Sequence, residues 1–443
     1  MTKIDQSRLK MLTEREESSY SKEHPRSRAV FERAKASLLK GVPMAWMHRW
    51  AGPFPIFIRE AKGVQVTDVD GHRYLDLCLG DTGALFGHSP AATAEAITRQ
   101  ARRGITSMLP TEDSVWVGEN LARRFGLPYW QIYMTATDAN KFAIRVARHI
   151  TKRKLILVFD GCYHGSVDET LVNYRRDRLF IPQMFDLSLT TRVVQFNDIE
   201  ALEAALAPGD IACVLCEPAM TNVGIIFPIP GYHEALREMT RRFGTLLIID
   251  ETHTICGGPS GLSGAWNLEP DIFVLGKPIA GGFPAAVMGL SQQVVDRFLV
   301  GLPREWDMGL GGTLSGNALA VAALRATLEN VMTEAAFNHM IPLAERLNDG
   351  IDEIIKAAGL PWYVLRLGCR VEYRFHPTPP RNGAEAIAAY ETEVDKFIHL
   401  YFVNRGILIT PLHTMMLISP ETTAEDVDRH NRVLRECVGE LVG

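Results

Sequence analysis

Short apolar runs alternate with amphipathic segments through the middle of the chain. Seven runs have the length and the polar boundaries of buried strands; they lie at 131–135, 155–159, 193–196, 211–216, 246–250, 272–276 and 284–290. Helical periodicity fills most of the intervals, for example at 142–150 and 232–243. This alternation predicts an α/β fold whose large domain holds a mainly parallel seven-stranded sheet covered by helices. Functional residues are then expected just after strands, where ligands bind in such sheets.

The two ends of the chain predict a second domain. Residues 64–69 and 73–77 flank Asp70-Gly71, the turn sequence of a tight hairpin. Beyond residue 330 the pattern predicts two helices and short strands between them, at 335–358, 363–375, 407–410 and 424–442. We therefore expect a small α+β domain built from both chain ends. The predicted boundaries are 1–75 for an N-terminal arm and part of the small domain, 76–330 for the large domain, and 331–443 for the C-terminal small domain.

Composition and charge exclude several classes of protein. The 443 residues are 47% hydrophobic and 22% charged, as in ordinary globular enzymes. A net charge of −5, from 47 Lys and Arg against 52 Asp and Glu, disfavours nucleic acid as a partner. Residues 1–25 are too polar for a signal peptide, and the longest apolar stretch, 211–230, is interrupted by Glu217 and three prolines. We expect a cytoplasmic protein with no membrane partner.

The seven cysteines form no disulfide framework, which favours reduced thiols. Cys213 and Cys216 make a C-x-x-C pair, but both lie in the run 211–216, which is predicted to be a buried strand. We interpret them as core residues rather than as a redox pair. No metal site is predicted.

Lys277 stands at the end of a predicted buried strand, between Ile-Phe-Val-Leu-Gly and Pro-Ile-Ala-Gly-Gly. Partial burial disfavours the charged form of a lysine and frees its amine for a Schiff base. The alternative is a lysine that extends its amine from a strand end into solvent.

Asp250 favours the first interpretation. It ends the strongest strand of the chain, Leu-Leu-Ile-Ile-Asp, so its carboxylate is expected at the same edge of the sheet as Lys277. A Schiff-base lysine and an anion that keeps a pyridine nitrogen protonated are the two groups that pyridoxal phosphate requires.

A phosphate site is predicted at 135–139, Thr-Ala-Thr-Asp-Ala, between a strand expected to end at Thr135 and the helix that follows. Hydroxyls, backbone N–H groups and the helix dipole suit a phosphate there. Ordinary helix capping by Thr135 or Thr137 is the alternative. The position after a strand, alongside Lys277 and Asp250, favours phosphate binding.

Six motifs now identify a resemblance. They are Asp68-Val-Asp-Gly-His-Arg-Tyr-Leu-Asp76, Gly161-Cys-Tyr-His-Gly165, Glu217-Pro218, Ile248-Ile-Asp-Glu251, Leu275-Gly-Lys-Pro-Ile-Ala-Gly-Gly282 and Gly312-Thr-Leu-Ser-Gly-Asn317. In this order they resemble the class III aminotransferases, pyridoxal-phosphate enzymes of fold type I, and most closely the branch that contains glutamate-1-semialdehyde aminomutase. The resemblance covers about residues 52–322 and weakens in the C-terminal part.

The resemblance implies a role for each matching residue. Lys277 resembles the aldimine lysine that also moves protons, and Asp250 the partner of the pyridinium nitrogen. The remaining cofactor contacts implied are Tyr163 on the ring face, Ala136 and Thr137 at the phosphate, Asn222 near the phenolic oxygen, Glu217 as a structural acid, and Thr313 at the phosphate of a neighbouring subunit. His164 is expected to support its loop. A homodimer with shared sites follows from the role of Thr313.

Two departures from the family pattern concern the cofactor site. The usual Ser-Gly-Thr phosphate loop reads Thr135-Ala136-Thr137 here, so a β-carbon stands where the family has none. The valine that usually packs on the ring is replaced by Thr252, and His253 follows it. Thr252 and His253 add polar atoms whose role the sequence does not reveal.

A third departure concerns the substrate pocket. Trp46 occupies the position of a carboxylate-binding arginine, and a tryptophan cannot form a bidentate pair with a carboxylate. Arg49 is the nearest candidate for a displaced guanidinium, and His413 is another place to look. Tyr163 is expected to line the substrate pocket together with Trp46 and Arg49. The segment 173–180, Asn-Tyr-Arg-Arg-Asp-Arg-Leu-Phe, also lacks the small residues of the aminomutase lid.

These departures lead to an expected function. We predict a transaminase that moves an amino group between a small-molecule donor, an amine or hydrophobic amino acid, and a carbonyl acceptor, a keto acid or ketone. The alternative is a glutamate-1-semialdehyde 2,1-aminomutase. An inactive binding protein with the same fold is a weaker alternative.

Overall fold

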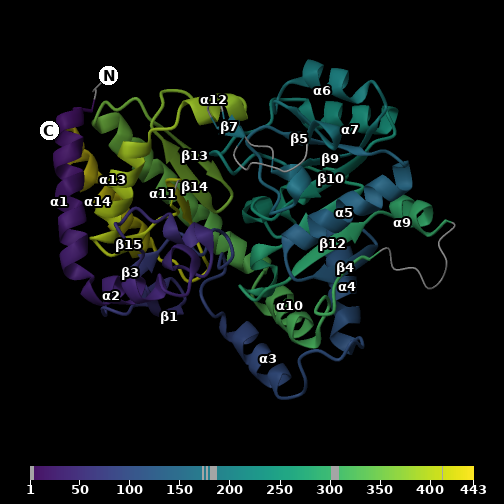
Figure 1. The fold of residues 1–443 in the computed structure, drawn as a ribbon, viewed down its shortest axis with the longest axis horizontal. Helices are drawn as coiled ribbons and strands as arrows, with labels where there is room; N and C mark the ends of the chain where they lie inside the picture. Colours follow the sequence, from purple (N-terminus) through teal and green to yellow (C-terminus); the bar gives the residue numbers. More distant parts are fainter. Residues whose placement is uncertain (1–3, 172–173, 176–177, 180–186, 301–308, 412) are drawn as a thin grey trace. The chain divides into compact units, whose positions relative to one another are not determined.

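The computed structural model describes residues 4–171, 174–175, 178–179, 187–300, 309–411 and 413–443 (Figure 1). The chain divides into two compact units. The first comprises residues 1–90, 335–379 and 389–443, and the second comprises 91–334 and 380–388. The domain boundaries expected from the sequence, 1–75, 76–330 and 331–443, stay a prediction.

The second unit is built on a seven-stranded sheet. Its strands follow the order β4 (Tyr129–Tyr133), β12 (Ala286–Leu290), β11 (Ile272–Leu275), β10 (Leu246–Asp250), β9 (Ile211–Cys216), β5 (Leu155–Phe159) and β8 (Thr191–Val194). β12 runs antiparallel to both of its neighbours, and every other neighbouring pair is parallel. The predicted fold class, an α/β unit with a mainly parallel seven-stranded sheet, is confirmed.

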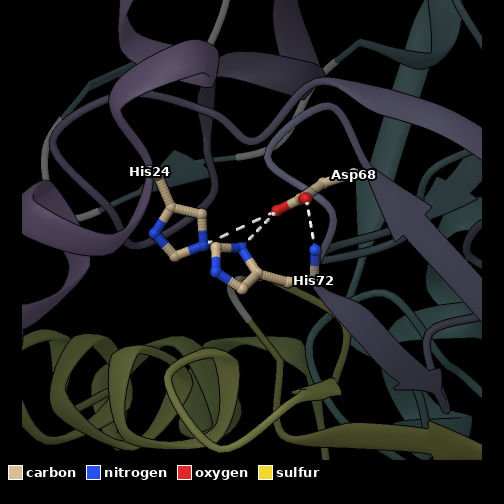
Figure 2. Close-up of side chains that lie close together, drawn as sticks. All are labelled: His24, Asp68 and His72. Carbon is tan, nitrogen blue, oxygen red and sulfur yellow. Dashed lines mark hydrogen bonds and ion pairs between the residues drawn. The ribbon is translucent and has the colours of Figure 1, made fainter.

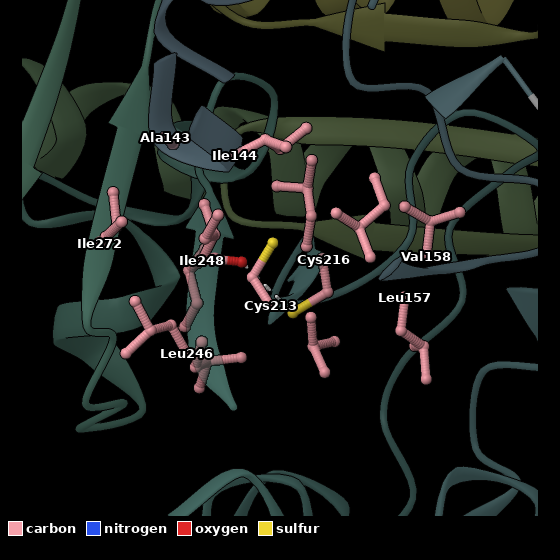
Figure 3. Close-up of a cluster of buried hydrophobic side chains, with 14 of the residues drawn as sticks. Ala143, Ile144, Leu157, Val158, Cys213, Cys216, Leu246, Ile248 and Ile272 are labelled. Atoms are coloured by element: carbon pink, nitrogen blue, oxygen red, sulfur yellow. Dashed lines mark hydrogen bonds between the residues drawn. The ribbon is translucent and has the colours of Figure 1, made fainter. Parts of the chain in front are cut away.

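Central strands of this sheet are apolar at nearly every position because both of their faces are covered. All six residues of β9 are buried, and Cys213 and Cys216 lie among Leu157, Ile248 and their apolar neighbours (Figure 3). Burial raises the pKa of the Cys213 thiol to about 12, so neither the environment nor the protonation state suits a redox pair. The interpretation of both cysteines as core residues is confirmed.

Helices and short segments surround the sheet. They are α3 (Ala91–Ala101), α4 (Glu112–Phe125), α5 (Ala136–Thr151), α6 (Ile199–Leu206), α7 (Tyr232–Arg242), α8 (Gly261–Ala265), α9 (Gln292–Leu299), α10 (Ala318–Asn330) and α12 (Gly383–Ala388), with the hairpin β6 (Tyr174–Arg175) and β7 (Arg178–Leu179). Helix α5 is strongly amphipathic, and its buried stripe at Ala139, Ala143 and Val146 packs on the core of the sheet.

The first unit contains two sheets. One has the order β1 (Ile58–Lys62), β2 (Gln65–Asp68), β3 (Arg73–Asp76), β15 (Ile407–Leu408), and the other β13 (Tyr363–Leu367), β14 (Arg370–Arg374), β16 (Met415–Leu417). The predicted hairpin is β2–β3, in which Gly71 adopts the positive φ of +100° that the turn requires. Its helices include α11 (Glu334–Ala357), α13 (Thr392–Val403) and α14 (Ala424–Val442). The parallel pair β3–β15 joins the two chain ends, as predicted.

The N-terminal segment is more ordered than a surface arm. It forms α1 (Gln6–Glu23) and α2 (Pro25–Ala34). Leu9, Leu12 and Tyr20 are buried on one side of α1, and Asn404 donates from the other chain end to the Glu16 carboxylate at 2.7 Å. The sequence prediction missed this helix because few apolar residues, at helical spacing, anchor an otherwise charged segment.

A buried aspartate fixes the β2–β3 turn of the first unit. Asp68 accepts hydrogen bonds from the backbone of Gly71 at 2.7 Å and of His72 at 2.8 Å, from the His72 ring at 3.0 Å and from the Tyr74 hydroxyl at 2.8 Å. His24 also faces this carboxylate (Figure 2). The three side chains His24, Asp68 and His72 are close enough to hold a metal ion, but Tyr74 and the turn already satisfy them.

No helix among the described residues is both long enough and apolar enough to cross a membrane.

Candidate active site

The candidate site residues lie where strands of the second unit end. Lys277 follows β11, Asp250 ends β10, Glu217 follows β9, Tyr163 follows β5, and α5 follows β4. β9, β10 and β11 run parallel, and β4 has the same direction because β12 is antiparallel to both β11 and β4. The carboxyl ends of these strands therefore share one edge of the sheet, which is where α/β proteins bind ligands.

Asp250 is a buried, ionised carboxylate. Its Oδ2 accepts from Asn140 Nδ2 at 2.8 Å and lies 3.1 Å from His164 Nδ1, and its Oδ1 accepts from the Thr252 backbone at 3.0 Å. Burial alone would raise its pKa, but the hydrogen bonds from His164, Thr252 and Asn140 lower the pKa of Asp250 to about 2. The group is therefore an anion at any ordinary pH.

His164 stabilises this anion by direct contact. Its side chain is fully buried, which disfavours the imidazolium form, yet the neighbouring Cys162 and Asp250 raise the pKa of His164 well above its ordinary value. Its carbonyl also accepts from Asn140 Nδ2 at 3.2 Å. The residue thus holds both Asp250 and the start of the loop after β5.

Lys277 occupies an unusual backbone position. It follows Gly276 and has a φ of +47°, in the left-handed region that a lysine rarely adopts. Its side chain is half-buried, and Nζ lies 2.5 Å from Nε2 of His253. Thr252 helps to fix this arrangement, because its hydroxyl accepts from the Gly276 backbone at 3.2 Å.

The N-terminus of α5 begins at the same edge. Strand β4 ends at Tyr133, two residues earlier than predicted, and Thr135 is the N-cap of α5, where its hydroxyl accepts from the Asp138 backbone at 3.2 Å. The structure therefore confirms that Thr135 caps the helix. The first backbone N–H groups of a helix have no partner within the helix, so those of α5 can still bind a phosphate.

Two glycines make room at this helix end. A β-carbon on Gly276 would lie 2.9 Å from the β-carbon of Ala136, and one on Gly165 would collide with Thr137. The Thr137 hydroxyl accepts from the Ser166 backbone at 3.1 Å. Ala136 is tolerated in place of the family glycine because Gly276 leaves space for its β-carbon.

Glu217 anchors the loop after β9. Thr221 donates to it from both its hydroxyl and its backbone, and Asn222 Nδ2 donates to it at 3.1 Å. Burial raises the pKa of Glu217. The structure thus joins two predicted site residues, Glu217 and Asn222, in one hydrogen-bonded group.

Tyr163 and Thr313 are the other two predicted cofactor contacts in this unit. Tyr163 is half-buried, with its hydroxyl 3.4 Å from that of Ser166. Thr313 is exposed in a turn and lines a surface cleft of about 680 Å³ together with Met108 and Ser315. Exposure of Thr313 is consistent with a contact to a neighbouring subunit, which stays a prediction.

Of the predicted substrate-pocket residues, Trp46 and Arg49 belong to the first unit and Tyr163 to the second. Trp46 is 41% exposed, and the Arg49 guanidinium lies 5.2 Å above its indole ring, a cation–π contact. His413 lies 3.3 Å from the buried Glu372. Their placement in a substrate pocket stays a prediction. Of the segment 173–180, residues 173, 176–177 and 180 lie outside the described residues.

The donor set at the sheet edge fits pyridoxal phosphate. A buried carboxylate with a pKa near 2 would pair with a protonated ring nitrogen, the open N-terminus of α5 would hold a phosphate, and an amine at a strand end would bind the aldehyde carbon.

Asn140 and His253 are the site residues that sequence reasoning left without a role. Asn140 lies one turn into α5, so helical spacing from Ala136 could have indicated it, whereas the contact of His253 depends on two separate loops.

Comparison with known proteins finds a family model that matches most of the chain. Residues 46–434 match the family model described as aminotransferase class-III. A glutamate-1-semialdehyde 2,1-aminomutase of Sorangium cellulosum is 34% identical over 430 residues, which cover 94% of this chain and 96% of the relative.

Solved structures are similar over nearly the whole chain. The crystal structure of a glutamate-1-semialdehyde-aminomutase from Pseudomonas aeruginosa PAO1 is 50% identical, with a TM-score of 0.96 over 99% of both chains. Its K286A variant was solved in complex with PMP. An omega-transaminase from Sphaerobacter thermophilus is 26% identical, with a TM-score of 0.84 over 94% of this chain and 98% of that chain.

Proposed function

Because the chain belongs to the class III aminotransferases, enzymes that use pyridoxal phosphate, we propose that it exchanges an amino group between neighbouring carbons of one substrate, as a glutamate-1-semialdehyde 2,1-aminomutase does. The supporting observation is the 50% identity over 99% of the chain to a protein of that description. This proposal revises the order predicted from sequence, in which a transaminase acting on two substrates came first.

The roles proposed for the residues follow from their geometry. When bound, pyridoxal phosphate withdraws electrons from the substrate carbon that loses a proton. Asp250 would keep the ring nitrogen protonated, because its own proton affinity is too low to take that proton. Lys277 would bind the cofactor and then carry a proton between substrate and cofactor carbons. The backbone of Ala136 and Thr137 would hold the phosphate.

The remaining residues would orient the cofactor. Tyr163 would pack on the ring face, and Asn222, held by Glu217, would lie near the phenolic oxygen. Thr313 would reach the phosphate of a second subunit, so the active form would be a homodimer. Its exposure in a turn supports this role.

A transaminase is the second candidate, and Trp46 supports it. An indole covered by the Arg49 guanidinium is a poor carboxylate receptor, and its exposed face suits an apolar group. Such an enzyme would accept an amine or hydrophobic amino acid and pass the amino group to a separate keto acid or ketone.

One experiment separates the two candidates. The protein loaded with pyridoxal phosphate is given glutamate-1-semialdehyde alone, and the product is followed by mass spectrometry and NMR. An aminomutase gives an isomer of unchanged mass with no second carbonyl compound. If the semialdehyde is not isomerised and aryl-alkyl amines are consumed only when a keto acid is added, the transaminase is correct.

A matched pair of variants tests the pocket. Trp46→Phe keeps an apolar ring, whereas Trp46→Arg introduces a guanidinium. If Trp46 contacts the substrate, Trp46→Arg should improve the use of carboxylated substrates relative to amines, and Trp46→Phe should not. Equal specificity in both variants would place the substrate elsewhere.

A further inference from the structure

His253 contacts the lysine amine directly. Its Nε2 lies 2.5 Å from Lys277 Nζ, and the residue is buried, with 7% of its surface exposed. A hydrogen bond shielded from water between two groups that both bind protons is a strong one. The contact therefore constrains where the free amine of Lys277 points.

The imidazole sits on a rigid support. It follows Thr252, which donates its N–H to Asp250 and accepts the Gly276 N–H on its hydroxyl. β10 and β11 are adjacent parallel strands, so this link ties together the loops that carry the histidine and the lysine.

The loop beyond His253 is fixed as well. Glu251 accepts from the Leu262 and Ser263 backbones and from the Thr254 hydroxyl, which holds the segment between β10 and α8. Lys277 itself has a positive φ of +47°, a conformation that a non-glycine residue keeps only where the surrounding structure enforces it.

Imidazole suits both protonation states of the lysine. When Lys277 is an ammonium group, it donates to an unprotonated Nε2. When the amine is neutral, an imidazole N–H at Nε2 can donate to its lone pair. An apolar side chain in place of the histidine could serve neither state, and a carboxylate could only accept a hydrogen bond from the ammonium group.

We propose that His253 is a positioning residue that holds the free amine of Lys277 in the direction from which it binds the cofactor and takes a substrate proton. The inference rests on the proposed role of Lys277. It gives a function to the Thr-His pair that replaces the family valine and its neighbour.

Cofactor capture tests this proposal without any substrate. Full-length protein is stripped of pyridoxal phosphate, fresh cofactor is added, and the rise of the visible absorption band is followed by stopped flow. His253→Ala should capture cofactor about 10- to 100-fold more slowly, as expected for the loss of one hydrogen bond to a charged group. His253→Gln, which keeps a polar atom at similar reach, should recover most of that loss.

His149→Gln is the matched control, because His149 is a half-buried histidine of the same unit, far along α5 from its N-terminus. It should capture cofactor at the wild-type rate. Capture by His253→Ala at the wild-type rate would overturn the proposal. So would equal impairment of His253→Gln and His253→Ala, because imidazole shape rather than hydrogen bonding would then matter.

An isotope effect separates positioning from structural support. With a donor deuterated at the carbon that loses its proton, the primary isotope effect on turnover should be larger in His253→Ala than in wild type, because proton transfer by an unheld amine becomes slower than the other steps. A structural role would lower the melting temperature and the cofactor content and leave the isotope effect unchanged, and that result would contradict us. Since capture needs no substrate, a wrong substrate assignment leaves the first test unaffected.

Discussion

The two units each bury an aspartate beside a histidine, and the two pairs serve different ends. Asp68 in the first unit accepts four hydrogen bonds, all from the turn and strand that follow it, and one more histidine faces it. The hydrogen bonds that Asp250 in the second unit accepts come from α5, the loop after β5 and its own loop. Asp68 closes a local turn, whereas Asp250 joins three separate segments at a sheet edge.

The difference shows what distinguishes a site from a structural network. Both carboxylates have a lowered pKa and a histidine partner, so neither feature alone indicates chemistry. Asp250 lies at the carboxyl end of a parallel strand, on the same edge of the sheet as Lys277. Asp68 ends a strand of an antiparallel hairpin and faces the turn of that hairpin.

Among the predicted effects, the loss of turnover in Asp250→Asn should be the largest. Asp250→Asn removes the anion proposed to hold the ring nitrogen protonated, so turnover should fall by about 10²–10³-fold, the usual cost of losing one preorganised electrostatic partner. Steady-state kinetics and a cofactor titration measure it. Turnover within a few-fold of wild type would rule out this role.

The same change in the first unit should affect stability instead. Asp68→Asn directs an amide N–H toward groups that themselves donate, which leaves buried donors unsatisfied and should lower the free energy of unfolding by about 3 kcal/mol. Denaturant unfolding measures this, and cofactor content per folded molecule should be unchanged. A variant that is fully stable would show that the turn does not depend on Asp68.

Acid should reveal the contribution of Asp250 to stability. Its folded-state pKa of about 2 lies below the ordinary value of 3.8, so its contribution is complete above about pH 4 and is lost as the pH falls toward 2. The shift corresponds to about 2 kcal/mol. The unfolding free energies of wild type and Asp250→Asn should therefore converge between pH 5 and 2. A constant difference would contradict the lowered pKa.

The smallest predicted effect is a loss of stability at either of two similar helix caps. Thr135 caps α5 and Thr423 caps α14, and each hydroxyl also donates to an aspartate three residues on, Asp138 and Asp426. Alanine at either threonine should cost about 1 kcal/mol of stability. Thr135→Ala alone should also weaken cofactor binding in a titration, since its helix end is the proposed phosphate site. Equal cofactor affinity in both variants would argue against that site.

The sequence predicts the buried centre of the fold best. Strands β5, β9 and β10 have the predicted bounds because uninterrupted apolar runs define both of their ends. β4 and β8 begin two residues earlier than predicted, since their partly exposed positions weaken the pattern.

Some features of the candidate site could likewise be predicted from the sequence, and others could not. Lys277 and Asp250 are visible because each ends an apolar run. The link from Thr252 to Gly276 and the contact between His253 and Lys277 cannot be read from the chain, because they depend on the lateral pairing of β10 and β11 and on a lysine with a positive φ.

The central claim is that the sheet edge formed by Lys277, Asp250 and the start of α5 binds pyridoxal phosphate through the lysine. Borohydride reduction of the wild-type protein loaded with pyridoxal phosphate, followed by peptide mass spectrometry, tests it most directly. We predict one pyridoxyl group per chain, on Lys277. A label on another lysine, such as the exposed Lys141 of α5, or no label at all, would contradict the account.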